Sequence, residues 1–236
     1  PTWAGARCRV AHLSDLQLSE GDPVAYFRAV MQRVKEAKPD ILFITGDFVA
    51  EAEQAPHLSA ILSLFQPPLG IYAVLGNHDY WVGADVVRPH LLASGVRLLG
   101  SEWERLRGGS EPIAVWGYEE PWHAPQRAPQ RGEGELLLSI THRADNIRRL
   151  CQRGVDVVFS AHFHGGEVCL PFVGKIELPS SYGERFHCGH FLVGESHLFV
   201  SSGIGSVQAD WRLQCPPSVF IVDIYGQNGA VTAPTE

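Results

Sequence analysis

The first eighty residues alternate short apolar runs with longer amphipathic stretches. Mostly apolar residues fill positions 8–13, 41–45 and 71–75, and apolar residues recur at helical spacing over 24–34 and 58–65. A short continuous apolar run predicts a buried strand, whereas a period near 3.6 predicts an amphipathic helix. This part of the chain therefore predicts a β-α-β-α-β unit, whose strands run parallel and are joined by helical crossovers.

The rest of the chain continues this pattern and then changes. Further strands are expected at 96–99, 113–118, 136–141 and 155–160, and helices at 84–93 and 146–153. Shorter strand-like segments follow at 168–170, 189–193, 197–201 and 219–224, and these suit the second sheet of a sandwich. Residues 119–135 are rich in Pro, Gln, Arg and Gly and predict a surface loop. No linker or internal repeat interrupts the chain, so a single domain over residues 1–236 is expected.

Polar side chains follow the predicted strands at the points where the strands end. The residues in this position are Asp15, Asp47, Asn77, His142, His162 and His164. The carboxyl ends of parallel strands lie along one edge of a sheet, which is where open α/β sheets bind their ligands. The sequence therefore predicts that these six side chains meet, although each has a simpler explanation alone. A lone Asp after a strand commonly caps a helix, and a lone His is commonly solvated or in the core.

Carboxylates, a carboxamide and imidazoles together form a mixed oxygen and nitrogen donor set. Such a set suits Mn, Fe, Co or Zn better than Ca. Two divalent ions need about seven or eight donor positions, and one shared carboxylate can bridge them. Gly165 and Gly166 follow His164 and let the backbone bend sharply there.

Five short blocks resemble the calcineurin-like metallophosphoesterases. The blocks are Asp15-Leu16-Gln17, Gly46-Asp47, Gly76-Asn77-His78-Asp79, Thr141-His142 and Ala161-His162-Phe163-His164. The resemblance covers about residues 9 to 166. It implies an α/β fold, a four-layer α/β/β/α sandwich of two mixed sheets, with a two-metal centre.

The same resemblance implies which residues hold each ion. One ion would be held by Asp15, Gln17, Asp47 and His164. The other would be held by Asp47, Asn77, His142 and His162, with Asp47 bridging. The first block usually reads Asp-x-His, and this chain has Gln17 in place of that His. A neutral carboxamide oxygen is a harder donor than imidazole, which favours Mn or Mg at that site. The expected cofactors are therefore two divalent ions, Mn first, with Fe, Zn, Co or Mg as alternatives.

The C-terminal segments are similar to a narrower branch of the family. Gly165-Gly166-Glu167, Leu170-Pro171-Phe172, Ser202-Gly203-Ile204-Gly205 and Cys215-Pro216-Pro217 look like bacterial members related to the UDP-diacylglucosamine pyrophosphatases. This resemblance implies a small phosphorylated substrate, with a lipid-linked nucleotide as one candidate. Residues 170–174 are then a candidate apolar surface for an acyl chain, or else part of the core.

Catalysis is expected to use a water rather than a protein nucleophile. Two ions about 3.5–4 Å apart can bridge a water, lower its pKa and deliver hydroxide to phosphorus. His78 is the candidate group for protonating the leaving oxygen or stabilising the transition state, and Asp79 for orienting its ring. Arg143 and His123 are the candidate substrate-binding residues.

Composition excludes some partners and leaves others open. The net charge of −7 argues against electrostatic binding of nucleic acid, so a nuclease of the same superfamily is a second hypothesis. A scaffold that keeps the fold without catalysis is a third. Five scattered cysteines favour reduced thiols and a cytoplasmic protein, or one that contacts the cytoplasmic face of a membrane peripherally. The chain begins at Pro1, and an upstream anchor stays open as an alternative.

Overall fold

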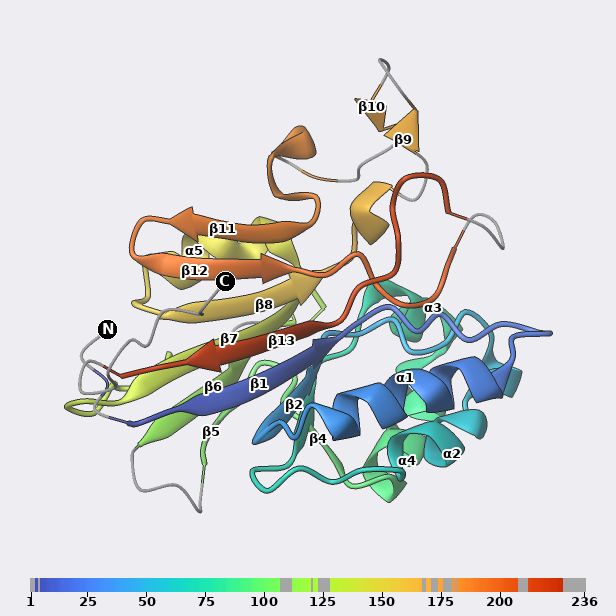
Figure 1. The fold of residues 1–236 in the computed structure, drawn as a ribbon, viewed down its shortest axis with the longest axis horizontal. Helices are drawn as coiled ribbons and strands as arrows, with labels where there is room; N and C mark the ends of the chain where they lie inside the picture. Colours follow the sequence, from blue (N-terminus) through green and yellow to red (C-terminus); the bar gives the residue numbers. More distant parts are fainter. Residues whose placement is uncertain are drawn as a thin grey trace.

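A computed structural model describes residues 3, 5–106, 112–119, 121–122, 128–166, 169–170, 174–175, 180, 182–207 and 212–226. Its first sheet has the strand order β13-β1-β2-β3-β4 (Figure 1). The parallel strands are β1 (Cys8–Leu13), β2 (Ile41–Ile44), β3 (Ile71–Ala73) and β4 (Val96–Leu98). Strand β13 (Phe220–Ile224) runs antiparallel to β1, which makes the sheet mixed.

The second sheet has six strands in the order β11-β12-β8-β7-β6-β5. Their bounds are β5 (Trp103–Arg105), β6 (Ile113–Gly117), β7 (Leu136–Arg143), β8 (Val157–Ala161), β11 (Gly189–Val193) and β12 (Ser196–Val200). The edge strands β5 and β11 run antiparallel to their neighbours, β6 and β12 respectively. The four central strands run parallel to one another. Both sheets are thus mixed, as the family resemblance implies.

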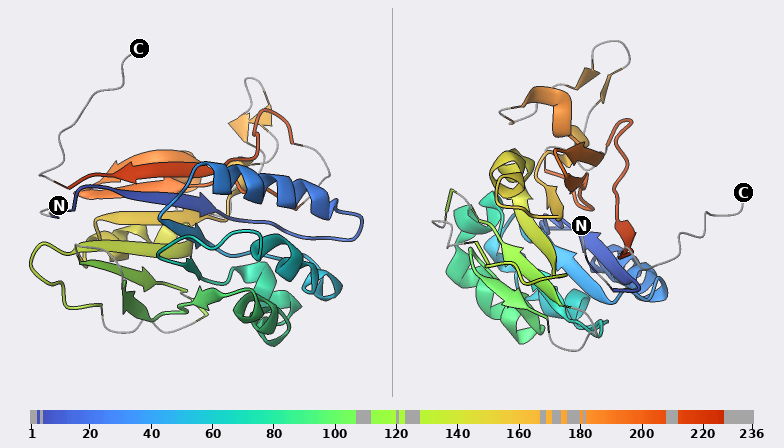
Figure 2. Two further views of the ribbon diagram at one scale, coloured as in Figure 1. Left: turned by 60° about the horizontal axis from the view of Figure 1, so that its bottom comes forward. Right: turned by 90° about the vertical axis from the view of Figure 1, so that its left-hand side faces the viewer.

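Helices cover the outer faces of the two sheets. Helices α1 (Val24–Glu36), α2 (His57–Leu62) and α4 (Ala84–Ala93) pack on the first sheet, and α5 (Ile147–Cys151) packs on the second (Figures 1 and 2). Shorter helices are α3 (Asn77–Val82), η1 (Ala52–Gln54), η2 (Ala144–Asn146), η3 (His164–Gly166) and η4 (Gly183–Phe186). Alternate strand residues point to opposite faces: Leu136 and Leu138 join the core between the sheets, and Leu137 packs under α5. The layers are therefore helix, sheet, sheet and helix.

Some sequence-based expectations for the later strands were wrong. The strand at 219–224 belongs to the first sheet, where Val222 pairs with Val10, and not to the second. Strands β9 (Cys169–Leu170) and β10 (Gly174–Lys175) form a separate two-stranded ribbon. Alternation of apolar and polar residues identifies a strand but carries no information about its partner, which explains both errors.

The third strand is followed directly by a short helix. Asn77 opens α3, and the Asp79 carboxylate reaches back to the Gly76 amide at 2.9 Å. An acidic side chain at the third helical position that bonds the capping residue is one half of a capping box. The polar run 76–79 thus forms the start of helix α3, which fixes the positions of its side chains.

No helix within the described ranges has the length and apolarity needed to span a bilayer. The candidate acyl surface at 170–174 has Pro171, Phe172 and Val173 outside the described residues.

Candidate metal centre

The ends of the first three strands lie side by side and bring distant polar residues together. The Asp15 amide donates to the Gly46 carbonyl at 3.0 Å, and the Gln17 amide donates to the Asp47 carbonyl at 2.9 Å. The His78 amide, at the start of α3, donates to Asp47 Oδ1 at 2.9 Å. These bonds continue the contact between β1, β2 and β3 beyond the regular strands. The predicted convergence at one rim of the sheet is therefore present.

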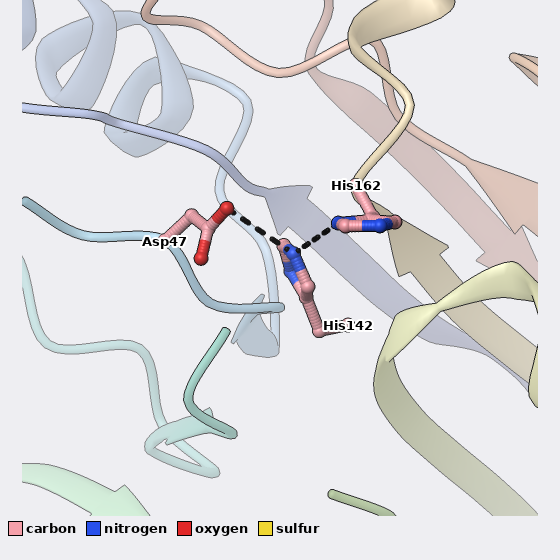
Figure 3. Close-up of side chains that lie close together, drawn as sticks. All are labelled: Asp47, His142 and His162. Carbon is pink, nitrogen blue, oxygen red and sulfur yellow. Dashed lines mark hydrogen bonds and ion pairs between the residues drawn. The ribbon is translucent and has the colours of Figure 1, made fainter. Parts of the chain in front are cut away.

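One group of donor atoms surrounds the ring of His142. His142 Nε2 lies 3.2 Å from Asp47 Oδ2 and 2.9 Å from His162 Nδ1 (Figure 3). It also lies 3.1 Å from Asn77 Oδ1. Asp47, His142 and His162 each offer a ligand atom within 4.8 Å of the others. His142 lies in strand β7 of the second sheet, whereas Asp47 lies in the segment that follows β2 of the first sheet. The group thus spans both sheets.

A second group forms around Asp15. Asp15, Asp47 and His164 also have ligand atoms that all lie within 4.8 Å of one another. His164 Nε2 lies 3.1 Å from Asp15 Oδ1, and both side chains are buried. Asp47 is a member of both groups, so its carboxylate is placed to bridge two ions.

Two buried oxygen atoms in this region have unused acceptor capacity. Gln17 donates its Nε2–H to Asp47 Oδ2 at 2.9 Å, which leaves Gln17 Oε1 as an acceptor without a hydrogen-bond partner in the described chain. Asp15 Oδ1 has His164 Nε2 at 3.1 Å and keeps a further lone pair as an acceptor. Buried acceptors are normally satisfied. An orphaned amide oxygen and a buried carboxylate oxygen with a spare lone pair fit divalent cations, because a cation supplies the missing partner.

Most of these residues adopt a backbone conformation that L-residues seldom take. Seven described non-glycine residues have positive φ, and five of them are proposed ligands: Asp15, Gln17, Asp47, His162 and His164. Such conformations persist only where surrounding contacts hold them, and they cluster at functional sites. The strand ends are thus bent to aim side chains inward. The sequence contains no direct signal for this.

Gly76 allows the start of α3 to approach Asp47 closely. A Cβ atom on Gly76 would overlap Asp47 Oδ1 and would lie 2.6 Å from the Asp47 amide nitrogen. Any larger residue would therefore push Asn77 and His78 away from the centre. The glycine of this block is required by close packing rather than by turn geometry, since its φ is −102°.

Asp79 holds the backbone of this region. Its carboxylate accepts hydrogen bonds from the amides of Asp47, Phe48 and Gly76 at 2.8, 2.8 and 2.9 Å. Burial and the nearby Asp47 carboxylate raise the pKa of Asp79 to about 7. Both carboxylate oxygens accept from backbone amides, and the orientation of the His78 ring by Asp79 stays a prediction.

The remaining titratable groups have pKa values set by burial and by one another. Burial opposes the charged form of His142, but the Asp47 carboxylate outweighs it and raises the pKa of His142 to about 9. Burial and then the charge of His142 lower the pKa of His162 to about 3. For Asp47, burial acts upward, yet His142 brings the pKa below its usual value. A neutral imidazole and a carboxylate are the forms that bind metals.

The predicted catalytic and substrate-binding residues have different placements. The half-buried His78 ring packs against Trp81, with centroids 4.7 Å apart, and burial lowers the pKa of His78. Arg143 follows His142, keeps 30% of its side chain exposed and lies 3.5 Å from Asp145. His123 lies outside the described residues.

Sequence reasoning missed two residues that support the centre. The buried Glu119 carboxylate accepts from the Leu75 amide at 2.7 Å and from the Tyr80 hydroxyl at 2.5 Å, which anchors the chain on both sides of Gly76. The Thr45 carbonyl lies 2.6 Å from His142 Nδ1. Neither residue carries a local signal, because each acts on a partner far along the chain.

Comparison with known proteins identifies the family of this chain. The Calcineurin-like phosphoesterase family matches residues 8–166. An uncharacterized metallophosphoesterase of Aquifex aeolicus is 30% identical over 234 residues, which cover 94% of this chain and 87% of the relative. UDP-2,3-diacylglucosamine pyrophosphatase LpxG of Chlamydia trachomatis is 27% identical over 276 residues, covering 91% of this chain and 82% of LpxG.

A solved structure supports the fold alone. GAP50, described as the anchor in the inner membrane complex of Plasmodium, superposes with a TM-score of 0.53 at 10% identity, over 97% of this chain and 87% of GAP50. The family match spans all five sequence blocks, from Asp15 to His164. The chain therefore belongs to the calcineurin-like phosphoesterases, a family of metal-dependent hydrolases.

Proposed function

We propose that this protein is a dinuclear phosphohydrolase that cleaves phosphodiester or pyrophosphate bonds. The observation that carries the proposal is the position of Asp47, whose carboxylate belongs to both groups of candidate metal ligands. A shared carboxylate is the feature that joins two ions into one centre. The orphaned oxygen of Gln17 and the buried carboxylate of Asp15 complete a donor set with the right chemistry.

The proposal assigns four side chains to each ion. Asp15, Gln17, Asp47 and His164 would hold one, and Asp47, Asn77, His142 and His162 would hold the other. Bound divalent ions supply an acidified water and positive charge for the phosphoryl oxygens. Manganese is the first candidate because oxygen donors contribute five of the eight proposed positions.

The protein's own residues would handle the substrate and the proton. The bond from its amide to Asp47 fixes the main chain of His78, and the contact with Trp81 limits the motion of its ring. From there, the imidazole would donate its proton to the leaving oxygen as the P–O bond breaks. Arg143 would hold a phosphate oxygen through its guanidinium.

Hydrolysis of bis-p-nitrophenyl phosphate tests the proposal. The purified chain, stripped with chelator, is assayed after addition of Mn, Fe, Co, Zn or Mg. We expect turnover with at least one metal, and we expect Asp47→Asn to reduce it to background because both ligand groups lose a charge. Asp85→Asn, which alters an exposed carboxylate, is the matched control and should keep wild-type turnover. Absence of turnover with every metal would favour a scaffold that keeps the fold.

Pyrophosphate linkages in lipid-bearing nucleotides are the substrates to test first among natural compounds. The name of LpxG, a relative at 27% identity, motivates this choice. Release of UMP from UDP-2,3-diacylglucosamine would be compared with hydrolysis of a simple nucleoside diphosphate and of single-stranded DNA. Preference for the lipid-bearing substrate supports the narrower assignment, whereas cleavage of DNA that weakens with added salt would favour a nuclease.

A further inference from the structure

A buried histidine outside the proposed ligand set contacts the strand end beside the centre. His12 lies on β1 with 0% of its surface exposed, and its Nε2 is 2.9 Å from Thr45 Oγ1 on the neighbouring chain segment. Thr45 donates its hydroxyl proton to Ser14 Oγ at 2.8 Å. A hydroxyl has one proton, so Thr45 can only accept from His12. His12 therefore carries a proton on Nε2 and donates it to Thr45 Oγ1.

The other ring nitrogen of His12, Nδ1, lies in an apolar environment. Within the described chain, His12 Nδ1 is buried and has no hydrogen-bond partner. The ring packs edge-on against Phe159, at a centroid distance of 5.4 Å, and stacks on Phe220 at 6.1 Å. An orphaned polar atom in an aromatic pocket destabilises a fold, and a phenyl ring would avoid that penalty. Core packing alone does not explain an imidazole here.

Thr45 stands where regular strand geometry stops. Its amide still bonds the Leu13 carbonyl at 3.1 Å, but the next residue, Gly46, has a φ of +94° and turns the chain out of β2. The sheet thus holds the Thr45 amide, whereas the next peptide plane, which joins Thr45 to Gly46 and carries the Thr45 carbonyl, lies where the strand ends. Its carbonyl lies 2.6 Å from His142 Nδ1, and an Nδ1–H bonded there leaves Nε2 directed at Asp47.

We propose that His12 is a positioning residue for the metal centre. His12 holds the Thr45 side chain through its hydroxyl and thereby restrains the following peptide plane, which carries the Thr45 carbonyl. That carbonyl in turn sets the orientation and tautomer of His142. Backbone carbonyls that accept from ligand histidines commonly have this role, and losing such a contact weakens metal binding about tenfold to a hundredfold. The inference rests on the proposed metal centre.

Four variants separate positioning from packing. His12→Phe keeps an aromatic ring and removes the donor. Thr45→Val keeps the β-branched shape and the carbonyl but removes the hydroxyl. The double variant His12→Phe/Thr45→Val tests whether the two residues act through the same series of hydrogen bonds. His12→Gln restores an N–H donor. Metal affinity is measured by competition with a chromophoric chelator, using Zn or Co, and thermal unfolding is recorded on the chelator-treated full chain.

We expect His12→Phe and Thr45→Val each to weaken the binding of at least one ion about tenfold or more, with no further loss in the double variant. His12→Gln should recover most of the affinity. The unfolding midpoint of metal-free His12→Phe should equal or exceed that of the wild type, because the orphaned nitrogen is gone. A packing role predicts the reverse, a lower midpoint with unchanged affinity.

Two results would separate the failure of this inference from the failure of the metal centre. If the wild type binds ions and both single variants bind them within about twofold of the wild type, His12 is not a positioning residue. If the wild type binds no ion, the proposed centre itself is wrong. Should His12→Phe not fold, the comparison of Thr45→Val with the wild type decides in the same way.

Discussion

The carboxylate of Asp79 accepts a hydrogen bond from the backbone amide of Asp47 at 2.8 Å, across 32 residues of sequence. The proposed bridging ligand is therefore held at its main chain by a side chain from the next block. The same carboxylate binds the Gly76 amide at 2.9 Å, so one group joins the ends of two neighbouring strands. Asp79 consequently controls the distance between Asp47 and the start of α3.

Replacing Asp79 by Asn should lower both stability and activity. The carboxamide keeps the shape but brings an NH₂ donor against a backbone N–H, which leaves buried donors unpaired. We expect a loss of about 1–3 kcal/mol in the free energy of unfolding, measured by urea titration, and weaker metal binding. Asp85→Asn is the exposed control. Wild-type stability in Asp79→Asn would contradict the conclusion that the Asp79 carboxylate holds the backbone of Asp47 and Gly76 in place.

His78→Ala should reduce turnover in a manner that depends on the leaving group. A general acid matters most when the departing oxygen is basic. We expect a loss of about a hundredfold for an alkyl phosphodiester and a smaller one for bis-p-nitrophenyl phosphate. His57→Ala, an exposed site on α2, is the control. Equal losses on the two substrates would rule out proton donation by His78.

Gln17→Leu should weaken one of the two ions. The substitution removes the buried Oε1 acceptor and also the bond from Gln17 Nε2 to Asp47. We expect at least a tenfold loss of affinity for that ion, visible as lower metal content after dialysis. Gln17→His should instead shift preference from Mn toward Zn, because imidazole is a softer donor. Two fully retained ions in Gln17→Leu would show that Gln17 is not a ligand.

Acidification should destabilise the metal-free protein through His12. Burial lowers the pKa of His12 to about 3, although the Asp15 charge acts in the opposite direction. Below about pH 6.5 the unfolded chain binds a proton that the folded protein excludes, so stability falls as pH drops from about 6.5 toward 3. At pH 5 the loss is about 2 kcal/mol. His12→Phe should show a pH dependence smaller by this amount in urea titrations at pH 7 and 5.

Removal of divalent ions should lower the unfolding midpoint of the wild type. Asp15 and Asp47 are buried carboxylates, and a cation bound only to the folded state stabilises it by mass action. The contribution is about 2.7 kcal/mol when the free ion is about a hundred times its Kd. Differential scanning calorimetry with chelator, and then with added Mn, measures this shift. Asp47→Asn should respond much less, and an unchanged wild-type midpoint would argue against a bound metal.

The order of strands and helices could be read from the chain because burial imposes a local pattern. The run 41–45 is apolar at every position except its last, since β2 is covered on one face by helices and on the other by the second sheet. Polar residues right after such runs then had to lie at the sheet rim. This is why Asp15, Asp47 and Asn77 could be placed together from the sequence.

The contacts that aim those residues were decided only by the folded chain. The bond between the Thr45 carbonyl and His142 joins residues 97 positions apart, and it exists because two sheets stack face to face. The positive φ of Asp47 and the close approach of Gly76 likewise depend on neighbouring strands. Local sequence determines which segments become strands, because each must bury its own side chains. The orientation of a ligand depends on the packing of segments that carry no pattern in common, so only the tertiary structure determines it.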